Sequence, residues 1–286
     1  VMALFAPLTL VLMPVVILSL VLVGYALVYW AMDLGSVYAA FKLSGSSLLT
    51  LGYASEDTVW FKLVEFSEAM LGLVLVALLI AYLPSMYAAF SRRETAVALL
   101  EAYAGSPPTA REMIARTHRI GRLDSLEEVW SIWTVWFAEL EESHTSLAPL
   151  AFFRSPQPQR SWVTSAGAVL DGASLYLAAV DRPFNANAAI CIRTGFLALR
   201  QIASFFQIAY DPNPAPMDPI SIAREEFDEM YDDLAARGVA LKPDKDQAWR
   251  DFAGWRVNYD TVLLQLAAMT MAPYAPWSSD RSTINS

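Results

Sequence analysis

The chain has 286 residues, 56% of them hydrophobic, and a positive mean hydropathy of +0.37. These values exceed what is typical of a soluble domain and predict membrane-spanning segments. The formal net charge of −9 argues against nucleic acid as a partner, and the single cysteine, Cys191, excludes an intrachain disulfide framework and a thiolate metal cluster. Cys191 is expected to be a small core residue.

Charge is distributed unevenly along the chain. Residues 1–90 contain only Lys42 and Lys62 among the 20 basic residues, and five of the 29 acidic ones. We therefore predict a membrane module over residues 1–93 and a soluble domain over residues 94–286. The chain starts at Val1 inside an apolar run, and we expect that further residues precede it.

Two apolar runs have the length of membrane spans. Residues 1–32 carry no charge, and as a helix they extend about 48 Å, which crosses the roughly 30 Å hydrocarbon core once. Residues 68–90 form the second run, and Arg92 and Arg93 follow it. Basic residues mark the cytoplasmic side of a span. We therefore expect a multi-pass protein of the cell membrane, in contact with the lipid bilayer, whose C-terminal domain is cytoplasmic.

A third apolar segment lies between the spans, at residues 36–49. As a helix it covers roughly 20 Å, which is too short to cross a bilayer. A half-helix followed by irregular backbone is tolerated at membrane depth only where it is buried in protein or lines a water-filled cavity. The segment therefore predicts a pore helix.

The residues that follow this half-helix are Thr50, Leu51, Gly52 and Tyr53. The order span, half-helix, tetrapeptide, span over residues 15–90 resembles the pore of the tetrameric potassium-channel family with two spans per subunit. That family has a filter of Thr-Val-Gly-Tyr-Gly followed by Asp. The resemblance implies a homotetramer in which rings of backbone carbonyls hold a permeant ion, potassium or sodium. It implies no other metal and no cofactor.

The residue types fit that role. Gly52 gives the backbone conformational freedom, Thr50 can add a ring of hydroxyls, and Tyr53 is expected to pack outward against the pore helix. Ala54 and Ser55 stand where the family has Gly and Asp. If Ala54 needs a positive φ angle, it costs about 1 kcal/mol relative to Gly. The filter is expected at residues 50–54, and its selectivity for potassium over sodium stays open.

Polar residues surround the predicted filter. Four acidic residues are expected near the outer mouth, where they either concentrate cations or are ordinary solvated loop charges: Glu56, Asp57, Glu65 and Glu68. Ser46 in the pore helix stands where some members of the family carry a carboxylate that supports the filter.

The second span contains two candidate bending points for gating, Gly72 and Pro84. Inner helices of the resembled family open by bending or splaying, and proline kinks helices. The alternative is structural, because glycine in membrane helices permits close packing and proline near a helix end often produces only a kink.

Residues 94–286 are predicted to be all helical. A helix starts near residues 106–113 with Ser106 as its cap, and an amphipathic helix over residues 124–142 starts with a Ser125–Glu128 capping box. Further helices are expected at residues 161–180, 186–208, 221–236 and 246–271, with Gly238 ending the third of these. The sequence has neither the glycine pattern of a dinucleotide-binding domain nor the strands of a cyclic-nucleotide β-roll.

The apolar face of the helix over residues 124–142 is rich in tryptophan, and core packing is the expected role of its members: Leu126, Val129, Trp130, Trp133, Trp136, Phe137 and Leu140. Glu141 and His144 have the spacing of half a di-metal site, but His118, the other histidine, has no matching Glu. Ser143 beside His144 lacks a nucleophile-elbow pattern. We expect this helix end to be exposed to water.

The leading hypothesis is a tetrameric cation channel and not an enzyme, assembled or gated by its helical cytoplasmic domain, with a cytoplasmic ligand of unknown chemistry as a further partner. The alternative is a weakly selective or non-conducting, channel-like membrane scaffold or sensor, which Ala54 and the size of the C-terminal domain favour. The third hypothesis, a membrane-tethered enzyme, lacks a catalytic constellation.

Overall fold

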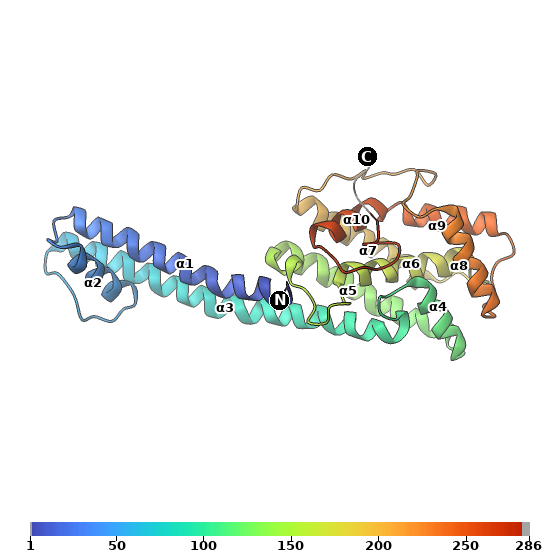
Figure 1. Ribbon diagram of the computed structural model, residues 1–286, viewed down its shortest axis with the longest axis horizontal. Coiled ribbons are helices and arrows are strands. Elements are labelled where there is room, and N and C mark those ends of the chain that lie inside the picture. Colours follow the sequence, from blue (N-terminus) through green and yellow to red (C-terminus); the bar gives the residue numbers. More distant parts are fainter. Residues whose placement is uncertain (1, 282–286) are drawn as a thin grey trace. The chain divides into compact units, whose positions relative to one another are not determined.

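The computed structural model describes residues 2–281, and every named element in that range is helical (Figure 1). The α-helices are α1 (Met2–Ala31), α2 (Val37–Leu48), α3 (Val59–Ala104), α4 (Ala110–Arg119), α5 (Leu126–Ser146), α6 (Trp162–Ala179), α7 (Ala186–Phe205), α8 (Arg224–Ala236), α9 (Lys245–Arg256) and α10 (Asp260–Met269). Two 3₁₀ helices are η1 (Leu123–Ser125) and η2 (Ala148–Phe152). The predicted all-α class is confirmed.

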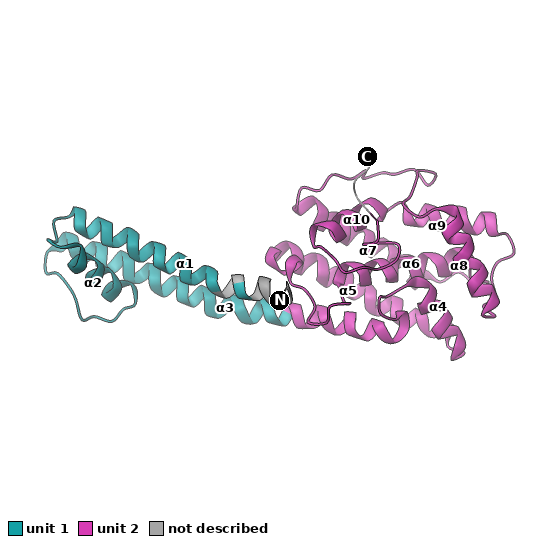
Figure 2. Ribbon diagram, in the orientation of Figure 1, with its two compact units in different colours: residues 1–88 teal, residues 89–286 magenta. Residues whose placement is uncertain are grey.

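The chain divides into two compact units, Val1–Ala88 and Ala89–Ser286 (Figure 2). The division falls five residues before the boundary expected from the sequence, which was placed between residues 93 and 94. The helix α3 crosses this division, because its last residues belong to the core of the second unit.

Three helical segments are long and apolar enough to cross a membrane: Leu12–Ala31, Val59–Ala104 and Ala186–Phe205. The first two leave their apolar surface open, since only 6% and 11% of their apolar windows are buried. The third, α7, is 56% buried and packs against α5 and α6 inside the second unit. Packing in the core of the second unit therefore accounts for much of the apolar character of α7.

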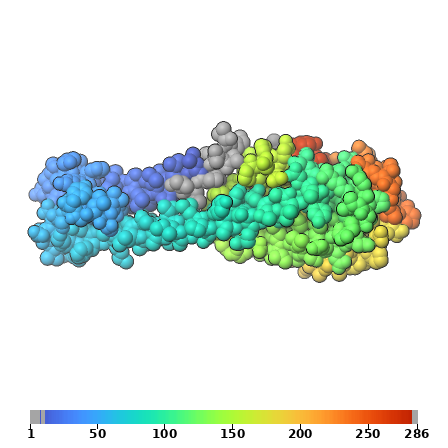
Figure 3. Space-filling model, turned by 90° about the horizontal axis from the view of Figure 1, so that it is seen from below, coloured from blue at the N-terminus to red at the C-terminus, as the bar shows by residue number. Residues whose placement is uncertain are grey.

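The helix α3 is longer than the predicted span at residues 68–90. It begins at Val59 and continues to Ala104 without a break, and Pro84 lies inside it. Beyond the predicted span, Val97, Leu100 and Ala104 are buried in the core of the second unit, so tertiary packing extends the helix. Figure 3 shows the outer side chains of α3 in cyan to green.

The core of the second unit forms around α5, α6 and α7. All seven members of the predicted apolar face of α5 are buried, as expected. Cys191 on α7 is fully buried, and burial raises the pKa of its thiol to about 12. Both results confirm core packing as the role of these residues.

Two predicted helix starts are wrong. Thr109, and not Ser106, caps α4, because its side chain accepts a hydrogen bond from the Glu112 amide. Ser125 does not form a capping box with Glu128: its backbone is already helical, and its hydroxyl donates to the carbonyl of Arg122 in η1. The preceding 3₁₀ turn occupies the place of a cap.

The predicted last helix, residues 246–271, is two helices. The helix α9 ends at Arg256, a short turn follows, and α10 begins at Asp260. The turn places Tyr259 in the core, and the side chains of Arg256 and Asp260 join each other across it at 2.7 Å. The Gly238 prediction is confirmed, because this residue has φ +84° directly after α8 and its C-cap, Arg237.

Candidate functional site

The pore helix predicted from the sequence corresponds to α2. Ser36 caps its start by accepting a hydrogen bond from the Ala39 amide at 3.1 Å. At its end the Leu51 amide donates to the Ser46 carbonyl at 2.8 Å and the Thr50 amide donates to the Ser47 carbonyl at 3.0 Å. These two bonds form a Schellman motif, which requires a left-handed residue after the helix.

Thr50 is that left-handed residue, with φ +54°. A β-branched side chain rarely adopts this conformation. Threonine is therefore an unfavourable residue at the position that ends α2. Gly52 is also left-handed, with φ +70°, as the sequence suggested. No atom lies within 4 Å of a Cβ built on Gly52, so glycine is needed there for backbone conformation and not for space.

The carbonyl groups of four consecutive residues are free. Within the described residues, none of the carbonyl oxygens of Thr50, Leu51, Gly52 and Tyr53 accepts a hydrogen bond, and all four residues are exposed. Buried backbone carbonyls need a partner within the protein, whereas exposed ones such as these are open to water or to a cation. A row of free ones after a helix C-terminus, the negative end of the helix dipole, favours a cation.

Ala54 differs from these four residues. Its amide donates to the Ser46 hydroxyl at 3.0 Å, and that hydroxyl donates to the Ala54 carbonyl, also at 3.0 Å. The φ angle of Ala54 is not positive, so the strain considered in the sequence analysis does not arise. Ser46 therefore joins the backbone of Ala54 to α2, and the Ala54 carbonyl already has a partner within the chain.

Tyr53 lies against the pore helix, as its position predicted. Its hydroxyl donates to the Lys42 carbonyl at 3.5 Å, and the Lys42 ammonium is 5.6 Å from the centre of the Tyr53 ring. The contact uses a backbone acceptor instead of a polar side chain.

Glu65 on α3 is hydrogen-bonded to the segment that follows residues 50–54. One carboxylate oxygen accepts from the Glu56 amide at 2.9 Å, and the other accepts from the Ser55 hydroxyl at 3.1 Å. Lys62 forms an ion pair with the same carboxylate at 3.5 Å. Glu65 is only 8% exposed, so it is not one of the solvated charges expected from the sequence, although it lies beside the segment after residue 54.

Glu68 is fully buried, which also contradicts that expectation. Its two oxygens accept from the Tyr29 hydroxyl at 2.9 Å and from the Ser44 hydroxyl at 2.5 Å. Glu68 therefore connects α1, α2 and α3. The sequence signal that could have indicated this network is the presence of Tyr29, Ser44 and Glu68 within mainly apolar helices. Glu56 and Asp57 are exposed, in agreement with the prediction.

Gly72, the first gating candidate, faces the end of α2. A Cβ built on Gly72 would lie 2.2 Å from the Leu48 carbonyl oxygen, so only glycine permits this approach of α2 to α3. Pro84, the second candidate, removes one backbone donor from α3 but does not interrupt the helix.

A second polar cluster lies where α3 enters the second unit. Arg93 is buried and donates to the carbonyls of Leu150 at 2.8 Å and Phe153 at 2.5 Å. Its guanidinium also contacts His144 Nε2 at 3.2 Å, and Ser143 Oγ lies 3.1 Å from His144 Nδ1. Ser143 and His144 are buried, so the expected exposure of this helix end is wrong for both.

This cluster does not form a catalytic triad. The imidazole nitrogen remote from Ser143 faces a guanidinium, whereas a triad places a carboxylate there. Burial and the positive charge of Arg93 lower the pKa of His144 well below its usual value. His144 is therefore a neutral acceptor for Arg93.

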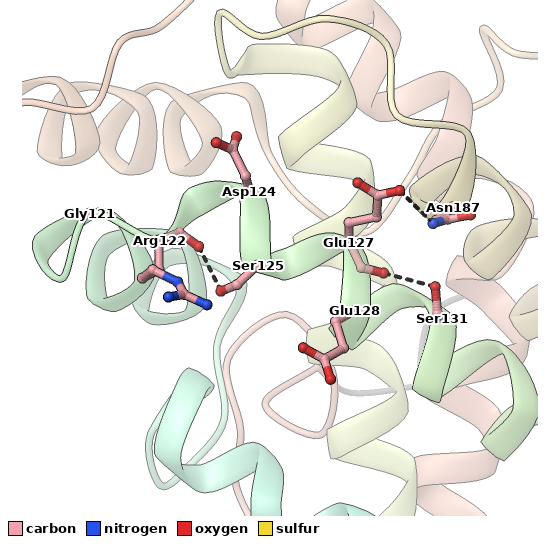
Figure 4. Close-up of a pocket in the computed structure, with 8 residues that line it drawn as sticks. All are labelled: Gly121, Arg122, Asp124, Ser125, Glu127, Glu128, Ser131 and Asn187. Atoms are coloured by element: carbon pink, nitrogen blue, oxygen red, sulfur yellow. Dashed lines mark hydrogen bonds between the residues drawn. The ribbon is translucent and has the colours of Figure 1, made fainter.

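A shallow polar hollow surrounds the start of α5 (Figure 4). Three of its lining residues are acidic, but their carboxylates do not converge (Figure 4). Glu127 points toward Asn187, to which it is hydrogen-bonded at 2.9 Å, and Asp124 and Glu128 point away from Glu127 on opposite sides. Across the residues that the structure describes, no group of three or more His, Cys, Asp or Glu side chains is arranged to hold a metal ion.

Comparison of the chain with models of protein families, with curated proteins and with solved structures yields no match.

Proposed function

We propose that this chain is the subunit of a homotetrameric cation channel in which residues 50–53 form the selectivity filter. The observation that carries the proposal is the row of four exposed, unpartnered carbonyls after a short helix. Carbonyl oxygens in this arrangement replace the water shell of a cation. Potassium is the expected permeant ion, and sodium is the competing one.

Four chains are needed because one chain supplies a single row of carbonyls, whereas a filter site requires a ring of them. The open apolar faces of α1 and α3 are available to lipid and to neighbouring subunits in such an assembly. In this proposal Ser46 and Glu65 hold the backbone of residues 54–56, directly after the filter, and Glu68 joins the pore helix to the two spans.

The second unit has an assembly or gating role in this proposal. The helix α3 is continuous from Val59 to Ala104, and Arg93 anchors it to the carbonyls of Leu150 and Phe153. A change in the second unit therefore acts directly on the inner helix of the pore.

Ion flux tests this function. The whole chain is reconstituted in liposomes, and potassium and sodium uptake are measured for it and for Gly52→Ala. We expect potassium uptake that this variant abolishes, because alanine disfavours φ +70°. Gly45→Ala is the matched control, since its Cβ would make only an ordinary contact, 3.6 Å from Leu22.

The alternative function is a non-conducting, channel-like scaffold or sensor. It is favoured by Ala54, whose carbonyl is occupied by Ser46 and adds no outer ring to the filter. Absence of uptake by a verified tetramer of the unaltered chain supports this alternative, and equal uptake by the Gly52→Ala variant contradicts the proposed filter.

A further inference from the structure

The second unit contains a pocket that the channel function does not use. It lies among the start of α4, α6, α8 and the C-terminal turn, and its volume is about 170 Å³. Apolar, acidic and basic side chains share its wall, among them Ala168, Met230, Trp277, Asp171, Glu229 and Arg111.

The floor of this pocket belongs to a buried cluster with unequal charges. Arg256, which is fully buried, forms ion pairs with Asp171 at 2.5 Å and with Asp260 at 2.7 Å. Asp171 is 3% exposed and Asp260 is 5% exposed. One guanidinium thus faces two buried carboxylates, and a buried charge without a partner is costly.

The hydrogen bonds of this cluster leave one oxygen without a donor. Both oxygens of Asp260 accept hydrogen bonds from Ser221. Asp171 Oδ1 accepts from Arg256 and from the Tyr259 hydroxyl at 2.9 Å. Within the described residues Asp171 Oδ2 accepts no hydrogen bond, although Asp171 lines the pocket. The oxygen that lacks a donor therefore belongs to a residue of the pocket wall.

We propose that this pocket binds a small organic amine whose ammonium group donates to Asp171 Oδ2 and whose alkyl part packs against Met230 and Trp277. The pocket offers this ligand one free buried carboxylate oxygen and an apolar wall. A metal ion would need several more oxygen ligands. An ammonium group satisfies the charge and donates the missing hydrogen bond at once.

Other charged groups near the pocket are consistent with this ligand. Glu226 is paired with Arg281 at 2.5 Å, and Arg111 lies 3.8 Å from Asp233. Glu229 is exposed and has no ion pair in the described part of the chain, so it adds negative potential at the rim. Burial raises the pKa of Asp171, whereas the charge of Arg256 and the hydrogen bonds from Arg256 and Tyr259 favour its ionised form.

Calorimetric titration of the whole chain in lipid nanodiscs tests the proposal. The probes are n-butylammonium, 1-butanol and butyrate, which share an alkyl chain and differ in charge. We expect saturable binding of n-butylammonium at neutral pH, and binding at least tenfold weaker for the other two. Equal binding of butanol, stronger binding of butyrate, or no binding of n-butylammonium to the folded chain overturns the proposal.

Variants locate the bound amine. Asp171→Asn is expected to weaken n-butylammonium binding at least tenfold, whereas Glu225→Gln, which removes an exposed charge of α8 outside the pocket, is expected to leave it within threefold. Ala168→Leu is expected to fill the pocket and weaken binding without changing a charge. This variant decides the test if Asp171→Asn does not fold. Unchanged binding by a folded Ala168→Leu variant refutes the site.

Discussion

At the scale of single residues, His144 shows how burial determines a protonation state. Its Nε2 accepts from Arg93, so its Nδ1 carries the proton and donates to Ser143, whose hydroxyl in turn donates to the Leu140 carbonyl at 3.3 Å. The hydrogen-bond network assigns this tautomer. Burial, and then the charge of the guanidinium that a proton at Nε2 would face directly, lower the pKa of His144.

We predict that His144 makes the second unit sensitive to acid. Its pKa is lowered on folding, so its contribution to stability is complete above the unfolded pKa of about 6.5 and is lost as the pH falls below that value. Between about pH 6.5 and 5.5 the loss should be about 1 kcal/mol, approaching about 1.4 kcal/mol per pH unit at lower pH. Denaturant unfolding of the protein at several pH values measures it.

The matched variants for this prediction are His144→Gln and His118→Gln. Glutamine at position 144 keeps a neutral acceptor for Arg93 but cannot be protonated, so the acid-dependent loss should shrink by about 1 kcal/mol over the same interval. His118 is half-buried and outside this cluster, and its replacement should preserve the loss. A His144→Gln variant with the pH profile of the unaltered chain would show that His144 is not its origin.

At the scale of elements, the contact between α2 and α3 depends on one glycine. We predict that Gly72→Ala destabilises the first unit by about 1–3 kcal/mol, because a Cβ at 2.2 Å from the Leu48 carbonyl forces backbone to move. Gly24→Ala on α1 is the matched control, since nothing lies within 4 Å of its Cβ. Thermal unfolding in detergent compares them, and equal melting temperatures would mean that α2 is not held this closely.

At the scale of the whole molecule, α3 belongs both to the predicted pore and to the core of the second unit. We predict that Arg93→Lys costs the second unit about 1–3 kcal/mol, because an ammonium is not shaped to satisfy two carbonyls and His144 as the planar guanidinium does. In the proposed channel it should change the open probability and leave the potassium-to-sodium ratio intact.

Arg92→Lys is the control for this prediction, because Arg92 is exposed and adjacent. Single-channel recording in planar bilayers separates the two effects. A changed ion preference in Arg93→Lys, or an equal change of open probability in Arg92→Lys, would contradict a role for Arg93 in coupling the second unit to the inner helix.

Periodicity and local chemistry were enough to predict the helical class, the short α2, the unusual backbone at Gly52 after it, and the buried tryptophan face of α5. Helix boundaries were less accessible. The extension of α3 past Phe90 depends on Val97 and Leu100 finding the core of the second unit, and the break at Tyr259 depends on burial of that ring. Both contacts are made with residues outside the helix in question, so the local sequence of that helix does not reveal them.

The sequence by itself determined which segments are apolar, where helices can form, and that Thr50 to Tyr53 follow a helix too short to cross a bilayer. Only the tertiary structure decided which polar groups are paired. Glu65, Glu68, Arg93 and His144 have the sequence appearance of surface charges, yet each is buried with partners 9 to 60 residues away in the chain. A pattern records the polarity of a residue, whereas its charge state and role depend on what packs around it.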